Sequence, residues 1–169
     1  IDKSDRIVIV TDPGSPMEAA AKADGYRIFN ADPTVGGRYS ALTAFGLVPS
    51  GLAGADIQGL LTDAVSAMDI LSRDDATNPG LVLGAVLART ANGSTFADKL
   101  GLVEAGTSIH GLGDWAEQLI AESTGKLGRG VLPVVLENSA PELVSKPSDL
   151  IVARLVADAN QANGDEVAV

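Results

Sequence analysis

Two short segments of the sequence carry side chains that could act on an anionic substrate. In the first, residues 35–40 (Val-Gly-Gly-Arg-Tyr-Ser), two glycines precede an arginine. Gly36 and Gly37 would let backbone N–H groups approach a ligand closely, and a helix that begins here would present the positive end of its dipole. Arg38 adds a permanent cation whose planar fork suits an anion or a developing oxyanion. The alternative is an ordinary glycine turn with a surface arginine.

The second segment, residues 111–130, predicts a helix with one polar face. Gln118 and Glu122 are four residues apart on that face, so their side chains are neighbours. Glu122 also lies near the expected helix end, where the dipole disfavours a negative charge, and such a carboxylate suits proton transfer. The alternative is a solvated helix face. An apolar stripe covers the opposite face: Leu112, Trp115, Ala116, Leu119 and Ile120.

Two weaker patterns lie beside the second segment. Residues 111–116 match the dinucleotide fingerprint G-x-G-x-x-A, and Glu137 falls roughly where a ribose-binding acid belongs. That motif needs its first glycine directly after a strand, whereas residues 104–110 intervene here. His110 precedes the helix as a lone histidine, and a catalytic triad needs side chains that converge in space rather than in sequence. A structural or surface histidine is the simpler interpretation.

The composition narrows the classes of partner and cofactor. The chain has 169 residues, the size of one domain, with 46% apolar but only 4% aromatic residues, so aliphatic side chains must form the core. Its formal net charge of −10 repels nucleic acid and anionic lipid. No apolar run approaches the roughly 20 residues of a membrane helix. With no cysteine and one histidine, we expect no disulfide and no metal.

The termini predict a piece of a longer protein. The sequence starts Ile-Asp-Lys, without an initiator methionine or a secretory leader, and its last residues read as the middle of an element. An acidic chain without cysteine fits the cytoplasm.

The elements alternate between strand and helix. Residues 6–10 are a β-branched run typical of a buried parallel strand. Ser15, Pro16 and Glu18 give three signals for a helix start, and Gly25 predicts its end before a strand at 26–29. We expect further helices at 38–47, 57–71, 81–91 and 111–123, and further strands at 99–103, 131–136, 150–155 and 166–169. The predicted class is a three-layer α/β sandwich with a mostly parallel sheet.

The same two segments resemble the signatures of the phosphoglucose isomerase family. Residues 35–40 look like its first signature, and residues 41–47 continue it in the expected pattern of small and apolar residues. Residues 118–126 (Gln-Leu-Ile-Ala-Glu-Ser-Thr-Gly-Lys) are similar to its second landmark. The similarity spans about residues 6–137 and is especially close to actinobacterial isomerases.

The resemblance implies a flavodoxin-like fold built from paired sugar-isomerase (SIS) domains. Residues 1–130 would then be the second half of the first SIS unit, and residues 131–169 the start of the next, with the chain truncated at both ends. The family is dimeric, so a homodimer is expected for the parent protein.

The resemblance also implies roles for individual residues in interconverting glucose 6-phosphate and fructose 6-phosphate. Glu122 would move a proton between C2 and C1 through a cis-enediol, and Gln118 would contact the substrate. Arg38, with the backbone of Gly36 and Gly37, would stabilise charge on the sugar oxygens. No cofactor or metal is implied. The family's phosphate loop, ring-opening histidine and C-terminal lysine have no match here, so we expect the fragment alone to be nearly inactive.

Two other functions stay open at this point. A non-catalytic SIS module would bind sugar phosphates without turning them over. A nicotinamide-dependent enzyme would use the glycines of residues 111–116.

Overall fold

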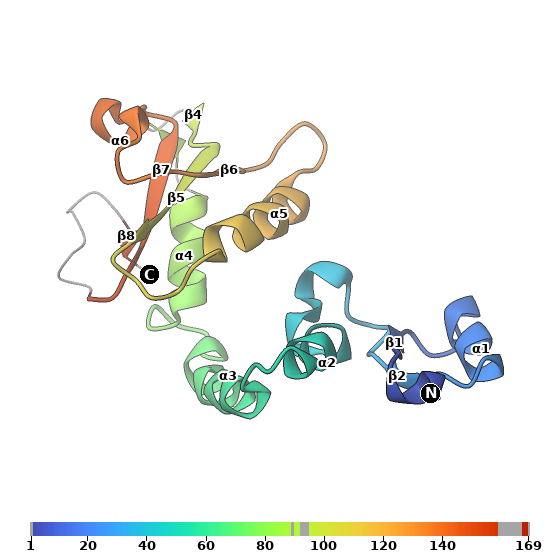
Figure 1. Ribbon diagram of the computed structural model, residues 1–169. Helices are drawn as coiled ribbons and strands as arrows, with labels where there is room; N and C mark the ends of the chain where they lie inside the picture. Colours follow the sequence, from blue (N-terminus) through green and yellow to red (C-terminus); the bar gives the residue numbers. More distant parts are fainter. Residues whose placement is uncertain (1, 89, 92–94, 159–166, 169) are drawn as a thin grey trace. The chain divides into compact units, whose positions relative to one another are not determined.

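The computed structural model describes residues 2–88, 90–91, 95–158 and 167–168. The chain divides into two compact units, Ile1–Asp69 and Ile70–Val169. Figure 1 labels the elements of both units, and each unit is described by itself.

The first unit begins with a strand–helix–strand motif. After a short 3-10 helix, η1 (Lys3–Asp5), strand β1 (Val8–Thr11) leads into helix α1 (Pro16–Ala23) and strand β2 (Arg27–Asn30). The two strands pair in parallel, from Val8 opposite Arg27 to Thr11 opposite Asn30. The expected helix signals are confirmed, because the Ser15 hydroxyl accepts the N–H of Glu18 and Gly25 adopts a φ of +75° after the helix.

The rest of the first unit is helical, and here one prediction was wrong. In place of a single helix over 38–47, the chain forms a 3-10 helix, η2 (Gly37–Leu42), and then helix α2 (Ala44–Leu52). Thr43 separates them, because it takes an extended conformation and its hydroxyl caps α2 by accepting the N–H of Phe45. Helix α3 (Ile57–Leu71) follows with the predicted bounds, and its last two residues belong to the second unit.

The second unit contains a four-stranded parallel sheet in the order β6-β5-β7-β8. Strands β3 and β4, of two residues each, pair antiparallel in a separate sheet. Neither this strand pair nor helix α6 was predicted. The elements of the unit are α4 (Pro79–Leu87), β3 (Thr90–Ala91), β4 (Thr95–Phe96), β5 (Lys99–Ala105), α5 (Leu112–Thr124), β6 (Leu132–Val135), α6 (Pro141–Ser145), β7 (Leu150–Val156) and β8 (Val167–Ala168).

The main cluster of buried apolar residues in this unit lies on one face of the sheet. Leu100 and Leu102 of β5 stand opposite Ile151 and Ala153 of β7, and all four are buried. Helices α4 and α5 cover them with partly buried side chains: Val86, Leu87, Ala116 and Ile120. Each fully buried aliphatic side chain contributes about 1.5–3 kcal/mol, so this contact fixes α5 on the sheet.

The fold class predicted from the sequence is confirmed as α/β with parallel sheets. The domain boundary expected at residue 130 falls inside the second sheet, since β6 and β7 pair with β5, whereas the compact units divide after Asp69. The predicted helix over 81–91 ends at Leu87. Of the strand expected at 166–169, residues 166 and 169 lie outside the described ranges. None of the helices within those ranges is both long and apolar enough to cross a membrane.

Candidate active site

The last two turns of α5 hold a glutamine and a glutamate together. The side-chain amide of Gln118 donates a hydrogen bond to a carboxylate oxygen of Glu122, at 3.0 Å, and both side chains are exposed. The pair exists because α5 buries Ala116 and Ile120 against the sheet and turns its polar face outward. A carboxylate accepts several hydrogen bonds, so the amide can orient it on the exposed face without using up its capacity to accept others.

The hydroxyl of Thr124 joins the end of α5 to Val131, the residue before β6. Thr124 donates to the carbonyl of Ile120 at 2.8 Å and accepts the backbone N–H of Val131 at 2.9 Å. A cavity of about 640 Å³ lies beside this joint. Its lining residues come from the end of α4, from β4 and the loop before β5, and from the end of α5 and the segment after it: Gly84, Leu87, Ala88, Phe96, Asp98, Thr124, Gly128, Arg129, Gly130 and Val131.

In the first unit, Arg38 lies in the first turn of η2. The helix starts without a side-chain cap at Gly36, and the Ser40 hydroxyl donates to the carbonyl of Gly37 at 2.7 Å. The Arg38 guanidinium lies 5.7 Å from the centre of the Tyr39 ring, a cation–π distance. Because η2 is a six-residue 3-10 helix, the helix dipole expected at Arg38 is weak, and the charge of the segment comes from the guanidinium itself.

The two glycines before Arg38 are not required by the backbone. Gly36 has a φ of −65°, and a Cβ atom at Gly36 or Gly37 would meet nothing within 4 Å among the described residues. Gly46 differs, because a Cβ there would overlap the carbonyl oxygen of Ala41. Gly46 therefore lets α2 fold closely against η2, whereas the glycine pair leaves open space beside Arg38.

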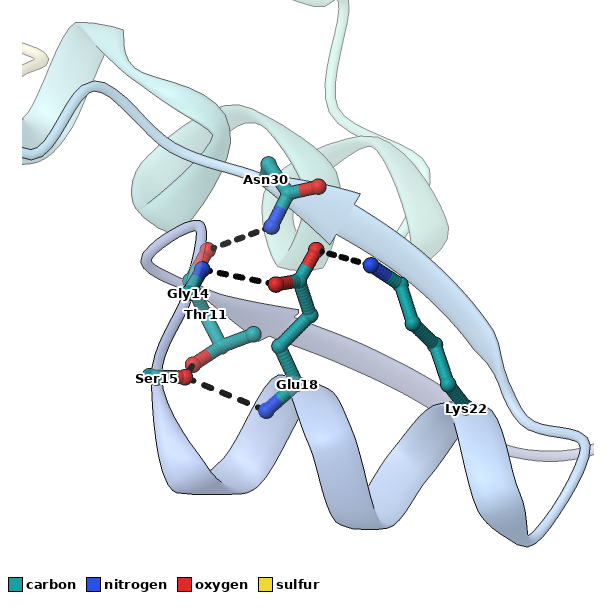
Figure 2. Close-up of polar contacts among 6 residues, drawn as sticks. All are labelled: Thr11, Gly14, Ser15, Glu18, Lys22 and Asn30. Carbon is teal, nitrogen blue, oxygen red and sulfur yellow. Dashed lines mark hydrogen bonds and ion pairs between the residues drawn. The ribbon is translucent and has the colours of Figure 1, made fainter.

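A buried polar network stands where the first unit's two strands end (Figure 2). Glu18, 8% exposed, accepts the Gly14 N–H at 2.7 Å and pairs with the Lys22 ammonium at 2.8 Å. The Thr11 and Ser15 hydroxyls lie 2.8 Å apart. The Glu18 carboxylate bonds the N–H of Gly14 rather than that of Ser15, so the helix start has no reciprocal capping box.

This network also holds the chain where it leaves β2. The carbonyl of Thr11 accepts the Ala31 N–H at 3.0 Å and the Asn30 amide at 3.5 Å, which fixes the exit from β2 (Figure 2). The Lys22 ammonium, followed by the Gly14 N–H, lowers the pKa of the Glu18 carboxyl, so it stays charged. Sequence reasoning found Ser15 and Glu18 from cap spacing but missed the strand-end partners, which have no local signal.

A second polar network in the second unit bears on nucleotide binding. Glu104, near the end of β5, accepts the N–H of Gly111 at 2.7 Å and lies 3.3 Å from the His110 ring. Desolvation raises the pKa of the Glu104 carboxyl, but the hydrogen bond and charge of His110, together with the N–H groups of Gly111 and Gly113, leave that pKa lowered overall. A carboxylate thus stands at the N-terminus of α5, where a pyrophosphate would have to bind. This geometry disfavours the dinucleotide interpretation of residues 111–116.

His110 belongs to this network rather than to a catalytic group. Its side chain is 78% exposed, and its partner is Glu104 rather than a nucleophile. The side-chain amide of Asn138 extends this network by donating to the Glu104 carbonyl at 2.9 Å. The Arg154 guanidinium in turn donates to the Asn138 amide oxygen at 3.3 Å. Asn138 and Arg154 were not predicted, since they approach Glu104 only when the three parallel strands align.

The sequence-predicted site residues therefore fall into two groups. Gly36, Gly37 and Arg38 are consecutive in the first unit, and Gln118 and Glu122 are hydrogen-bonded in the second. Within the described ranges, no three side chains of the types that bind metal ions cluster together.

Comparison with known proteins found curated relatives that share this region. The chain is 36% identical over 134 residues to the "Probable glucose-6-phosphate isomerase" of Haloarcula marismortui, covering 79% of this chain and 30% of that protein. It is 35% identical over 129 residues to the glucose-6-phosphate isomerase of Leuconostoc mesenteroides, covering 76% and 28%. The corresponding protein of Symbiobacterium thermophilum is 37% identical over 130 residues, covering 76% and 29%. The chain thus spans about 30% of the length of the relatives it matches.

A solved structure has a similar fold. The crystal structure of a hypothetical protein from Thermus thermophilus matches with a TM-score of 0.68 and 26% sequence identity, covering 90% of this chain and 39% of that one. No family model matches the sequence.

Proposed function

We propose that this chain is part of a glucose-6-phosphate isomerase, and that the whole protein interconverts glucose 6-phosphate and fructose 6-phosphate. The observation that carries the proposal is the Gln118–Glu122 pair, an oriented and exposed carboxylate within a region similar to proteins of that name. We include in this proposal that the substrate is a soluble sugar phosphate, that the whole protein is cytoplasmic, and that it is a homodimer. Each compact unit would be part of one SIS domain, with the division after Asp69.

In the proposed reaction, Glu122 is the base. Its carboxylate takes the proton from C2 of the open-chain aldose, the electrons of the broken C2–H bond form a C1=C2 double bond, and the carbonyl electrons move onto O1, giving the cis-enediolate. The protonated Glu122 returns the proton to C1, while the hydroxyl proton of C2 passes to the oxygen of C1, so the carbonyl moves to C2. Neither an oxidant nor a reductant is needed, and carboxylates are common bases in such steps.

Arg38 and Gln118 would have supporting roles. The Arg38 guanidinium would stabilise the negative charge that develops on the enediolate oxygens, and such stabilisation is a large term in catalysis. The open space at Gly36 and Gly37 supports a close approach of substrate to their backbone, because the fold itself makes no use of their missing Cβ atoms. Gln118 holds the Glu122 carboxylate by the 3.0 Å hydrogen bond.

The test is turnover of the full-length protein that contains this sequence. Glu122→Gln should lower kcat by about 10²-fold or more. Glu117→Gln, one residue before Gln118 on the same exposed helix, is the matched control and should keep full activity. In D2O, the wild-type product should acquire deuterium at the transferred position. Equal activity of the two variants would refute Glu122 as the base. Binding of sugar phosphate by a wild-type protein without turnover would favour a non-catalytic module.

A further inference from the structure

A tight turn directly after α5 carries two cations on one side. The N–H of Lys126 donates to the carbonyl of Arg129 at 2.8 Å, and the N–H of Arg129 donates back at 3.0 Å. The two central residues, Leu127 and Gly128, have φ values of +53° and +74°, as a two-residue type I′ turn requires. Residues that exchange both backbone hydrogen bonds place their side chains on the same face. Lys126 and Arg129 therefore project together.

The turn is held firmly against the end of α5. The Gly125 N–H donates to the Ala121 carbonyl at 2.9 Å, and a Cβ at Gly125 would come within 2.7 Å of that oxygen. A Cβ at Gly130 would lie 3.0 Å from the Cα of Gly125, so the two arms of the turn meet backbone to backbone. The Thr124–Val131 hydrogen bond fixes its far end. The cations are thus anchored just beyond the helical turn that carries the proposed base.

These two charges are not used by the fold of the described chain. Neither the Lys126 nor the Arg129 side chain has a hydrogen bond or ion pair with any residue in the described ranges, whereas Lys22 and Lys99 are bound by carboxylates. Leu127 between them is fully exposed, so the turn does not pack its tip into a core. Arg129 also lines the 640 Å³ cavity, so the turn borders open space.

The negative net charge of the chain suggests a role for Lys126 and Arg129 in attracting an anionic substrate. A chain of net charge −10 repels a phosphomonoester dianion, and Glu122 adds its own negative charge at the point of reaction. We propose that the turn Lys126–Arg129 is an electrostatic guide that draws the anionic substrate toward Glu122. This inference rests on the proposed isomerase function and deepens it, because it assigns a second anion-attracting element besides Arg38.

The test is the salt dependence of kcat/KM for fructose 6-phosphate in the full-length protein. The double variant Lys126→Gln/Arg129→Gln should lose about 3- to 10-fold in kcat/KM at low salt, with kcat unchanged. The loss should shrink below about 2-fold near 0.5 M salt, where screening acts within roughly 4 Å. The exchange Lys126→Arg/Arg129→Lys keeps both charges and should keep the wild-type salt slope.

Arg6→Gln/Arg27→Gln is the control matched in charge. Both arginines are exposed in the first unit, and this variant should keep a kcat/KM within about 2-fold of wild type and a wild-type salt slope. Three outcomes would overturn the guide role alone. They are a wild-type salt dependence of kcat/KM in the double variant, an equal loss of kcat/KM in the Arg6/Arg27 control, and a fall in kcat of the double variant. A wild-type protein without turnover would overturn the proposed function and the guide role with it.

Discussion

The hydroxyl of Thr124 offers a sharp test of how the proposed base is positioned. Thr124→Val keeps the β-branched shape but removes both hydrogen bonds, the donation to Ile120 and the acceptance from Val131. Val131 is 6% exposed, so its N–H would lose its acceptor at a mostly buried position. An unsatisfied buried donor costs about 1–3 kcal/mol, and we expect the variant to lose that much stability.

A second threonine provides the matched control. The hydroxyl of Thr62 in α3 makes the same kind of bond, to the carbonyl of Gln58 four residues earlier at 2.8 Å, and accepts no backbone N–H within the described ranges. Thr62→Val should therefore change stability by less than about 0.5 kcal/mol. Thr124→Ser retains the hydroxyl and should recover most of the loss.

The assay is urea unfolding followed by the fluorescence of Trp115, the single tryptophan, which lies on α5. With a slope of about 1–3 kcal/mol per molar urea, the midpoint of Thr124→Val should fall by roughly 0.3–3 M. Hydrogen exchange at the Val131 amide should accelerate in the same variant. If Thr124→Val loses no more stability than Thr62→Val, the hydroxyl does not join α5 to β6 and our account of this joint is incorrect.

Three further changes have expected outcomes. Because the pKa of Glu18 is lowered in the folded chain, its carboxylate stabilises the fold above the ordinary pKa of 4.5, and this stabilisation is lost as the pH falls through the folded pKa. Glu18→Gln should remove that part of the acid sensitivity in melting experiments. Because Asp149 and then Asp98 raise the pKa of Lys99, its stabilisation is lost as the pH rises above 10.5, and Lys99→Met should flatten the alkaline limb. Gly46→Ala should cost about 1–3 kcal/mol in urea unfolding, whereas Gly37→Ala should leave stability within about 1 kcal/mol and lower the turnover of the full-length protein.

The parts of the fold that the sequence predicted are those with local signals. The cap residues before α1, the glycine after it and the apolar period of α3 each act within a few positions, and each element formed as expected. The single helix expected over 38–47 failed because Thr43 bonds the carbonyl of Ser40 and the N–H of Phe45, a local alternative to helix that threonine favours.

The residues of the candidate site also divide into those that local spacing predicts and those that only strand pairing brings together. Spacing alone made Gln118 and Glu122 neighbours, because one helix carries both. Glu104, Asn138 and Arg154 could not be grouped from the sequence, since they come together only through the pairing of strands that are distant along the chain. The position of Arg38 relative to a helix start was expected, but the kind of helix was not.

Several glycines of this chain have a role that the fold itself explains, whereas Gly36 and Gly37 do not. Gly25 and Gly128 are needed for a positive φ, and Gly46 and Gly130 for close backbone contact. Each of these uses can be seen in the fold itself. The pair before Arg38 has neither use, although two adjacent glycines raise the entropy lost on folding. Under the proposed function, the open space that this pair leaves beside the Arg38 guanidinium is where an anionic oxygen of the substrate would lie.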